Sequence, residues 1–309
     1  MKAQTIESIP FFSPIKVWVK EWSEICKARL TLLVLMTTWA GFYLGARNQV
    51  DLGILLCTMV GTALVAAGAS AFNQFIERNI DSRMKRTLDR PLPAGRLNPD
   101  EVLLFALVTS IAGMLVLGFA VNHLAAAFSA LTLALYVFVY TPMKKYSSLN
   151  TLVGAVPGAL PPVIGWTAAS GTLSAEAWYL FAILFLWQMP HFLAIAWLYK
   201  DDYERGGLKM LANEDQDGLA TSRQSFAYAI ALLPVSLLPS MYLMVRAWYF
   251  PGAFILGLIY AWMAFQFMRK PDNVRAKKLF IASIIYLPLL LAWLVLNLSL
   301  IHISEPTRL

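Results

Sequence analysis

Long apolar runs separated by polar segments dominate the hydrophobic pattern of this chain. A helix needs about 20 mostly apolar residues to cross a bilayer, and nine stretches approach or reach that length. The expected spans are Leu30–Ala46, Leu52–Phe72, Glu101–Val121, Leu124–Thr141, Thr151–Ala169, Ala177–Tyr199, Gln224–Val245, Tyr249–Met268 and Leu279–Leu300. We therefore predict an all-α polytopic membrane protein with nine transmembrane helices.

Basic residues are distributed unevenly over the polar segments. If the N-terminus is cytoplasmic and the spans alternate, every Lys and Arg except Arg47, Arg246 and Arg308 falls on the cytoplasmic side. This asymmetry follows the positive-inside rule, so we expect the N-terminus inside the cell membrane and the C-terminus outside. The two long polar segments, 73–100 and 200–223, then lie on the cytoplasmic side, where we expect the active site.

The composition supports a membrane protein over a soluble one. Hydrophobic residues make up 59% of the chain and charged residues 14%, whereas soluble domains carry about 25% charged residues. Cytoplasmic loops explain the net charge of +7, so no nucleic-acid partner is expected. The two cysteines, Cys26 and Cys57, offer no metal-binding spacing, and no signal-peptide cleavage site follows the first apolar run.

The two ends of the chain differ from the apolar middle. Trp18 and Trp22 stand one turn apart among lysines, which is typical of an interfacial helix before the first span. After the last span the apolar pattern stops abruptly, which indicates an exposed or non-native tail without function. The expected parts are an N-terminal cytoplasmic and interfacial segment (1–29, with its helix within Pro14–Arg29), a nine-helix transmembrane domain (30–300) and a tail (301–309).

Three oxygen-bearing side chains, Asn73, Glu77 and Asp81, follow the second apolar run at intervals of four residues. On a helix they share one face, drifting by about 40° per step. Carboxylate and amide oxygens suit a hard divalent cation such as Mg²⁺, which in turn holds phosphate. Polar groups at the mouth of a membrane helix are costly and indicate function. An ordinary solvated loop with ion pairs such as Asp81–Lys85 is the alternative.

Arginines follow these ligands directly. Arg86, Arg90 and Arg96 lie in a stretch where Pro91 and Gly95 turn the chain. A guanidinium group makes bidentate contacts with phosphate oxygens, so cation ligands followed by arginines form a pattern suited to a diphosphate.

A second acidic cluster, Asp201-Asp202, follows the sixth span in the segment Tyr199–Gly207. It lies on the same predicted side of the membrane as the first cluster. Two such clusters at the ends of different helices could face each other and hold one or two metal ions between them. A plain polar loop is again the alternative.

Within the predicted spans, His191 is the one histidine, in the sequence Trp187-Gln-Met-Pro-His191-Phe. It precedes Asp202 by eleven residues, or about 16 Å on a continuous helix, and nearly shares its face. It could contact the metal or porphyrin of a substrate that enters from the membrane. Pro190 could bend the helix, and a hydrogen bond to a neighbouring helix explains the histidine equally well.

Two further features carry weaker signals. Lys144, at the end of the fourth span, could reach the diphosphate, although membrane anchoring accounts for it as well. The small residues and prolines of Gly154–Trp166 favour close helix packing, with a groove for a lipid-like chain as the alternative.

The first cluster and its sequel resemble the first signature of the UbiA superfamily of intramembrane prenyltransferases. The matching string reads Asn73-x-x-x-Glu77-x-x-x-Asp81, then Arg90-Pro-Leu-Pro-Ala-Gly-Arg96. The chain is more narrowly similar to the heme O synthase (protoheme IX farnesyltransferase) branch. Segments similar to that branch are Lys27–Leu33, Tyr140–Lys145, Pro157–Trp166 and Leu186–Phe192, together with Asp202-Tyr203. The resemblance covers about Lys27–Leu300.

The resemblance implies nine helices around a central cavity and transfer of farnesyl from farnesyl diphosphate to a vinyl group of heme b. It implies that the membrane is the cell inner membrane and that Mg²⁺ is the cofactor. The residues implied to bind the metal or act in catalysis are Asn73, Glu77, Asp81, Asp202 and Asp201. Those implied to bind the diphosphate are Arg86, Arg90 and Lys144, with His191 implied for the heme. Contact with a heme A synthase or a terminal oxidase is a further expectation.

The chain departs from the family pattern at three places. Glu77 replaces the usual middle Asp, Ala28 the usual Pro, and Leu211-Ala212 the usual Leu-Pro. The longer Glu arm changes the expected metal geometry. The alternatives are a related enzyme that prenylates an aromatic or quinone precursor, and a transporter or non-catalytic assembly factor of a heme oxidase. The position of the ionisable clusters at the cytoplasmic mouth argues against a transporter.

Overall fold

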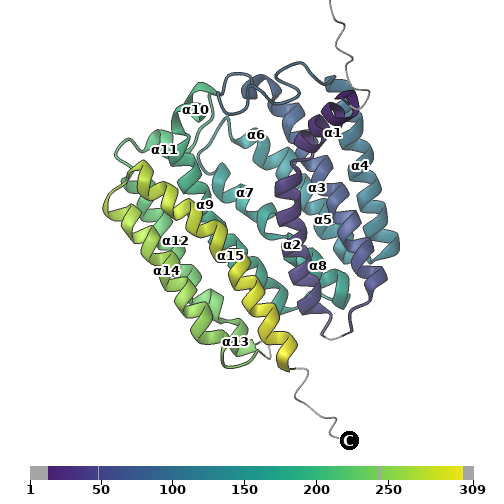
Figure 1. Ribbon diagram of the computed structural model, residues 1–309, viewed down its shortest axis with the longest axis vertical. Helices are drawn as coiled ribbons and strands as arrows, with labels where there is room; N and C mark the ends of the chain where they lie inside the picture. Colours follow the sequence, from purple (N-terminus) through teal and green to yellow (C-terminus); the bar gives the residue numbers. More distant parts are fainter. Residues whose placement is uncertain (1–12, 48, 243–244, 302–309) are drawn as a thin grey trace, which may run out of the picture.

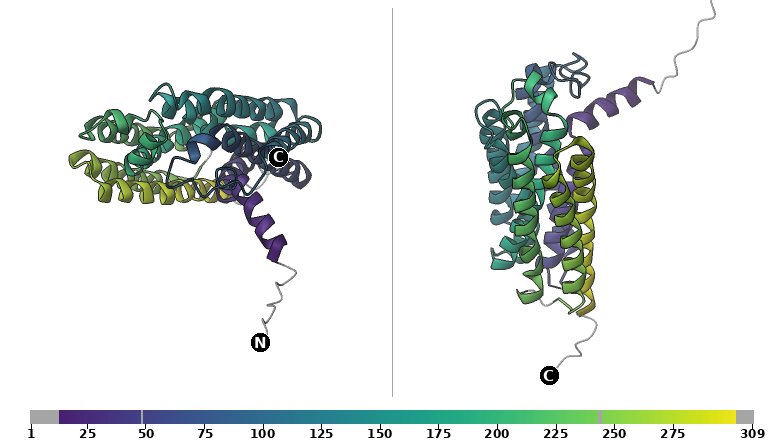
Figure 2. Two further views of the ribbon diagram at one scale, coloured as in Figure 1. Left: turned by 90° about the horizontal axis from the view of Figure 1, so that it is seen from above. Right: turned by 90° about the vertical axis from the view of Figure 1, so that its left-hand side faces the viewer.

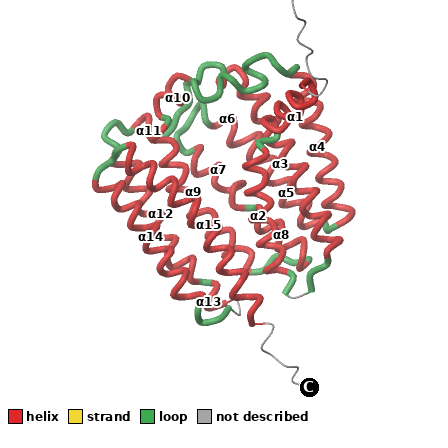
Figure 3. Tube along the Cα trace, viewed as in Figure 1, coloured by secondary structure: helices red, strands yellow, loops and turns green. Residues whose placement is uncertain are grey.

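The computed structural model describes residues 13–47, 49–242 and 245–301, and this part of the chain folds into helices joined by loops, with a long one at residues 82–98. Figure 3 shows that the loops gather at the two ends of the bundle. The helices are α1 (Ser13–Ile25), α2 (Ala28–Gly45), α3 (Leu52–Asp81), α4 (Pro99–Ala120), α5 (His123–Ala134), the π-helix η1 (Leu135–Tyr140), α6 (Thr141–Met143), α7 (Asn150–Ala159), α8 (Pro161–Ser170), α9 (Ala175–Leu198), α10 (Lys200–Arg205), α11 (Leu211–Glu214), α12 (Leu219–Leu237), α13 (Pro239–Tyr242), α14 (Tyr249–Arg269) and α15 (Asn273–Ile301).

The nine predicted membrane helices are confirmed within the described residues. Each expected apolar run coincides with a helix, or with consecutive helices, that is long and apolar enough to cross a bilayer. Two spans are composite: α5, η1 and α6 follow one another without a break, whereas α7 and α8 are separated at Leu160. Pro161 and Pro162 lack the N–H groups that would continue the helix there. The chain is therefore an integral, multi-pass membrane protein.

The helices form two groups that meet along α7, α8 and α9 (Figure 1). In the first group α2 packs on α8 and α3 packs on α4. In the second group α12 packs on α9 and α14, and α15 packs on the same two helices. Helix α1 leaves the bundle sideways, as the right-hand view of Figure 2 shows. The presence of α1 confirms that a helix precedes the first span, and its interfacial position stays a prediction. The proposed tail lies outside the described residues, apart from Ile301 at the end of α15.

Helix α3 extends beyond its predicted membrane span and includes Asn73, Glu77 and Asp81, as their four-residue spacing predicted. The apolar run ends at Phe72, and residues 73–100 read as a polar segment, but the helix continues to Asp81. At its start, Asp51 Oδ1 accepts hydrogen bonds from Gly53 N and Ile54 N at 2.8 and 3.0 Å. Its 30 residues correspond to about 45 Å, which exceeds the roughly 30 Å of a bilayer core. The last turns can therefore carry polar side chains beyond the apolar core.

Close approach between α2 and α8 depends on glycine. A Cβ at position 165 would lie 1.9 Å from Thr38 O, and one at position 41 would lie 2.0 Å from Pro162 O. Neither clash could be relieved by a side-chain movement because both oxygens belong to the backbone. Small residues at such contacts let membrane helices approach closely, which confirms the packing interpretation of the Gly154–Trp166 segment.

We expect Gly165→Ala to destabilise the protein by about 2 kcal/mol or more, because overpacking forces α2 and α8 apart. Gly118→Ala is the matched control, since its Cβ would lie 3.8 Å from Ala126, an ordinary contact. That variant should be neutral or slightly stabilising because alanine favours helix more than glycine does. Thermal melting of the detergent-solubilised protein measures both, and equal melting temperatures would contradict the packing argument.

Candidate active site

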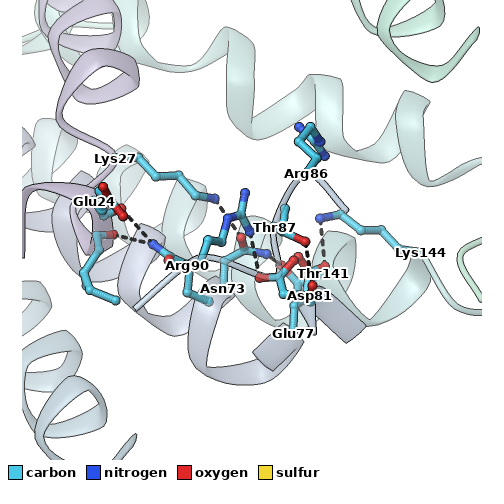
Figure 4. A network of polar contacts seen from close by, with 12 residues as sticks. Glu24, Lys27, Asn73, Glu77, Asp81, Arg86, Thr87, Arg90, Thr141 and Lys144 are labelled. Carbon is cyan, nitrogen blue, oxygen red and sulfur yellow. Dashed lines mark hydrogen bonds and ion pairs between the residues drawn. The ribbon is translucent and has the colours of Figure 1, made fainter. Parts of the chain in front are cut away.

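The predicted oxygen ligands lie together on the last turns of α3. Asn73, Glu77 and Asp81 are 1%, 5% and 1% exposed, so they are buried rather than solvated. Figure 4 shows their side chains close together, with Lys27, Arg90 and Lys144 directed toward them. The solvated-loop alternative is therefore wrong for these three residues.

Each of the three ligands is paired with a cation from a different segment of the chain (Figure 4). Lys27 Nζ donates to Asn73 Oδ1 at 2.8 Å, and Lys144 Nζ donates to Glu77 Oε1 at 2.8 Å. The third cation comes from the loop after α3, where Arg90 Nη1 donates to Asp81 Oδ2 at 2.7 Å. Two carboxylates and three cations converge here, an excess of positive charge that favours an anionic ligand.

Lys27, the first residue of the family-like segment Lys27–Leu33, contacts Asn73 although the sequence pattern assigned it no role in the site. It sits between α1 and α2 in a left-handed conformation, with φ 46° and ψ 52°, which costs a residue with a Cβ about 1 kcal/mol or more. Burial, together with the neighbouring charges of Arg90 and Lys144, lowers the pKa of Lys27 to about 7. The three cations are therefore crowded, and a polyanion between them would relieve their repulsion.

The residues fit a divalent cation only if the cation brings further ligands with it. Asp81 Oδ1 is buried and accepts no hydrogen bond from the described residues, so it is available as a ligand. Among those residues, no three His, Cys, Asp or Glu side chains gather into a metal site. Two carboxylates and an amide form an incomplete set that suits Mg²⁺, which binds through one or two carboxylates plus substrate phosphates.

The second acidic cluster meets the first through the loop of residues 82–98. Asp202 is 7% exposed and accepts hydrogen bonds from Lys85 N at 3.1 Å and from Arg205. Burial acts to raise the pKa of Asp202, but these hydrogen bonds hold it below its usual range. Asp201 is exposed and takes no part in these contacts.

The loop arginines have different roles in the structure. The Arg86 guanidinium lies over the rings of Tyr199 and Tyr203, at 5.1 and 5.6 Å from their centroids, and so joins the loop to α10. Arg96 Nε donates to Glu21 Oε1 at 2.9 Å and braces the loop against α1. Arg86, Arg90 and Arg96 all line an open polar cavity of about 460 Å³ between α1 and the loop.

The structure places His191 on α9, apart from the residues around α3, with Nδ1 2.7 Å from Ser283 Oγ. The expectation that His191 and Asp202 share a helix face is wrong. Helix α9 ends at Leu198 and α10 begins at Lys200, while Tyr199 between them has φ −117° and ψ 24°. The interruption breaks the helical periodicity on which the expectation depended.

Comparison with known proteins identifies the family. The sequence profile of the UbiA prenyltransferase family matches residues 34–300. The chain belongs to the UbiA prenyltransferase family. Within that family it is 46% identical over 288 residues to the protoheme IX farnesyltransferase of Solibacter usitatus, a match that covers 90% of this chain and 99% of the relative.

Solved structures agree with the UbiA fold. A digeranylgeranylglyceryl phosphate synthase superposes with a TM-score of 0.77 at 16% identity, covering 91% of this chain and 98% of the other. A UbiA homolog from Archaeoglobus fulgidus bound to GPP and Mg²⁺ gives 0.65 at 14% identity, covering 90% and 99%. At these identities the likeness concerns the fold alone, and it confirms the predicted helical architecture.

The Arg90–Asp81 pair supplies a test of the site's electrostatics. We expect Arg90→Gln to destabilise the protein by about 3 kcal/mol, because Asp81 is left as a buried carboxylate without its cation. Adding Asp81→Asn should recover much of that loss, since the uncompensated charge is then absent. Arg83→Gln, an exposed arginine of the same loop, is the control and should melt like the wild type.

Proposed function

We propose that the protein transfers the farnesyl group of farnesyl diphosphate to a vinyl group of heme b, giving heme O and diphosphate. The observation that carries the reaction class is the convergence of Lys27, Arg90 and Lys144 on the buried oxygens of α3. The acceptor and the prenyl length are supported by relatives named protoheme IX farnesyltransferase that match nearly the whole chain.

Binding of the diphosphate would exchange the ion pairs of the site. Asn73, Glu77 and Asp81 are proposed to hold Mg²⁺, with Asp202 and Asp201 contributing from the α10 side. When bound there, Mg²⁺ would supply positive charge that neutralises part of the charge of the diphosphate. The cations now paired with the α3 ligands would then turn to the diphosphate, so no buried charge is left uncompensated.

The same cations would stabilise the leaving group. As the allylic C–O bond breaks, its electron pair stays on the diphosphate and negative charge grows there. Arg86, Arg90, Lys144 and Lys27 are the residues proposed to face that charge. Groups already in position lower the barrier because they need no reorganisation during bond cleavage.

Capture of the farnesyl cation completes the proposed reaction. The vinyl π-electrons form the new C–C bond, and the cation that results on the porphyrin side chain takes up water and releases a proton. This gives the hydroxyethylfarnesyl group. Asn73 and Asp81 are 1% exposed, so their own polar atoms are shielded from bulk water. His191 is proposed to bind the heme.

The membrane orientation is also part of the proposal. The basic segments and the site lie at one end of the bundle and α15 ends at the opposite end, as Figure 1 shows. By the positive-inside rule the active site would face the cytoplasm across the cell inner membrane. A heme A synthase or a terminal oxidase would take up the product by contact with the protein.

A product assay tests the function. Purified protein with Mg²⁺, farnesyl diphosphate and heme b should form heme O, and excess chelator should abolish product formation. Asp81→Ala should lower the rate by at least about 100-fold, as removal of a preorganised charged group commonly does, while the protein still inserts in the membrane. Turnover of 4-hydroxybenzoate in place of heme b would contradict the acceptor, and full activity in chelator would contradict the metal-assisted mechanism.

Lys27 allows a separate test of diphosphate binding. We expect Lys27→Met to lower kcat/KM for farnesyl diphosphate by about 10- to 100-fold, the equivalent of one charge-assisted hydrogen bond. Methionine keeps the length of the side chain and removes its charge. Arg29→Met, an exposed cation two residues away, is the control and should retain wild-type kinetics. Equal kcat/KM values for the two variants would show that Lys27 does not contribute to diphosphate binding.

A further inference from the structure

Ser283 connects α15 to α9 at two neighbouring points. Its backbone oxygen accepts a hydrogen bond from Trp187 Nε1 at 2.8 Å, and its Oγ lies 2.7 Å from His191 Nδ1. Ser283 itself is fully buried. The serine hydroxyl is therefore held inside the membrane domain, where the imidazole of His191 is its neighbour.

The hydrogen bonds of Ser283 determine where the hydrogen of His191 resides. Ser283 Oγ donates its single hydrogen to Phe280 O, one turn earlier on α15, at 2.5 Å. The hydroxyl can then only accept from the imidazole, so Nδ1 of His191 carries the hydrogen. In the neutral ring this leaves an unprotonated lone pair on Nε2.

The surroundings of the ring leave Nε2 available. Three aromatic rings lie near the imidazole: Trp187 at 5.4 Å between centroids and 25° between planes, Phe280 at 5.0 Å and 32°, and Phe192 at 5.6 Å and 62°. None of these ring contacts supplies a hydrogen bond to Nε2, and Ser283 uses Nδ1. Nε2 has no hydrogen-bond partner among the described residues, and the side chain remains partly exposed.

We propose that Ser283 is a positioning residue that fixes the tautomer of His191, so that Nε2 can ligate the iron of the heme acceptor. This inference rests on the proposed function, since it concerns how that acceptor is held. Histidines that bind metals commonly donate their other N–H to a neighbouring oxygen, which fixes the ring and raises its basicity. Here that oxygen comes from α15 while the imidazole comes from α9.

Binding titrations test the ligand without requiring turnover. Ferric heme b, added to the full-length protein in detergent without farnesyl diphosphate, should give the absorption spectrum of a histidine-ligated heme. His191→Ala should lose that spectrum and bind heme at least about 10-fold more weakly. Metal-free protoporphyrin IX should bind equally to both proteins, since it offers no iron. His123→Ala, an exposed histidine at the start of α5, is the control.

Rescue separates ligation from a structural defect. Imidazole added to His191→Ala should restore the histidine-like spectrum, which it could not do if the substitution had only damaged the fold. A wild-type protein without a histidine-ligated spectrum would overturn the inference. So would a His191→Ala variant that keeps the spectrum, or one that loses heme and metal-free porphyrin to the same degree.

Ser283→Ala tests the positioning role. It removes Oγ but keeps the backbone oxygen that binds Trp187, so we expect a change confined to the imidazole: heme binding about 10-fold weaker, with unchanged protoporphyrin IX binding. Ser225→Ala removes an equally buried hydroxyl whose hydrogen bond, to Thr221 O, stays within α12. Equal heme affinities in the two serine variants would overturn the role of Ser283.

The product assay distinguishes this inference from the proposed function. If His191 ligates heme but no heme O is formed, the iron site is supported and the proposed reaction is contradicted. If the wild-type protein forms heme O but its His191→Ala variant binds heme normally, the proposed reaction is supported and iron ligation by His191 is excluded.

Discussion

A buried charge must be paired, and this requirement determines how the segments around the C-terminal end of α3 are arranged. Glu77 and Asp81 lie almost fully buried on α3, where an unpaired carboxylate would cost several kcal/mol, on the order of 3–5. Their cations come from the end of α6 and from the loop after α3. The pairing therefore dictates where these segments must lie, and it lets a helix continue for nine residues past its apolar run.

The position of α1 is also tied to this part of α3, through Gln74. Gln74, next to Asn73, donates through Nε2 to Glu24 O and Ile25 O, the last carbonyls of α1, at 3.1 and 2.8 Å. These bonds satisfy groups that a helix end leaves unpaired. The chain then turns through Lys27 into α2, so docking of α1 and placement of the Lys27 ammonium are consequences of one contact with α3.

The sequence predicted what depends on local pattern. Apolar length located the nine membrane helices, and four-residue spacing placed Asn73, Glu77 and Asp81 on one face. Lys27 could not be found in this way, because its contact with Asn73 spans 46 positions and depends on a left-handed turn. For the same reason the sequence did not show that Asp202 meets the first cluster through a backbone N–H, or that Tyr199 interrupts the helix.

Asp81 and His191 lie in different parts of the fold but share one arrangement. Arg90 holds Asp81 Oδ2, while Oδ1 has no partner in the part of the chain that the structure describes. Ser283 holds His191 Nδ1, and within the same residues Nε2 has no hydrogen-bond partner. In each group one atom is fixed by the protein and the other keeps a free lone pair. A metal ligand benefits from this division, because the fixed atom orients the group before the metal arrives. A purely structural polar residue gains more by pairing both atoms. The proposed Mg²⁺ and iron contacts thus follow from the same physical reasoning, applied at two positions in the membrane domain.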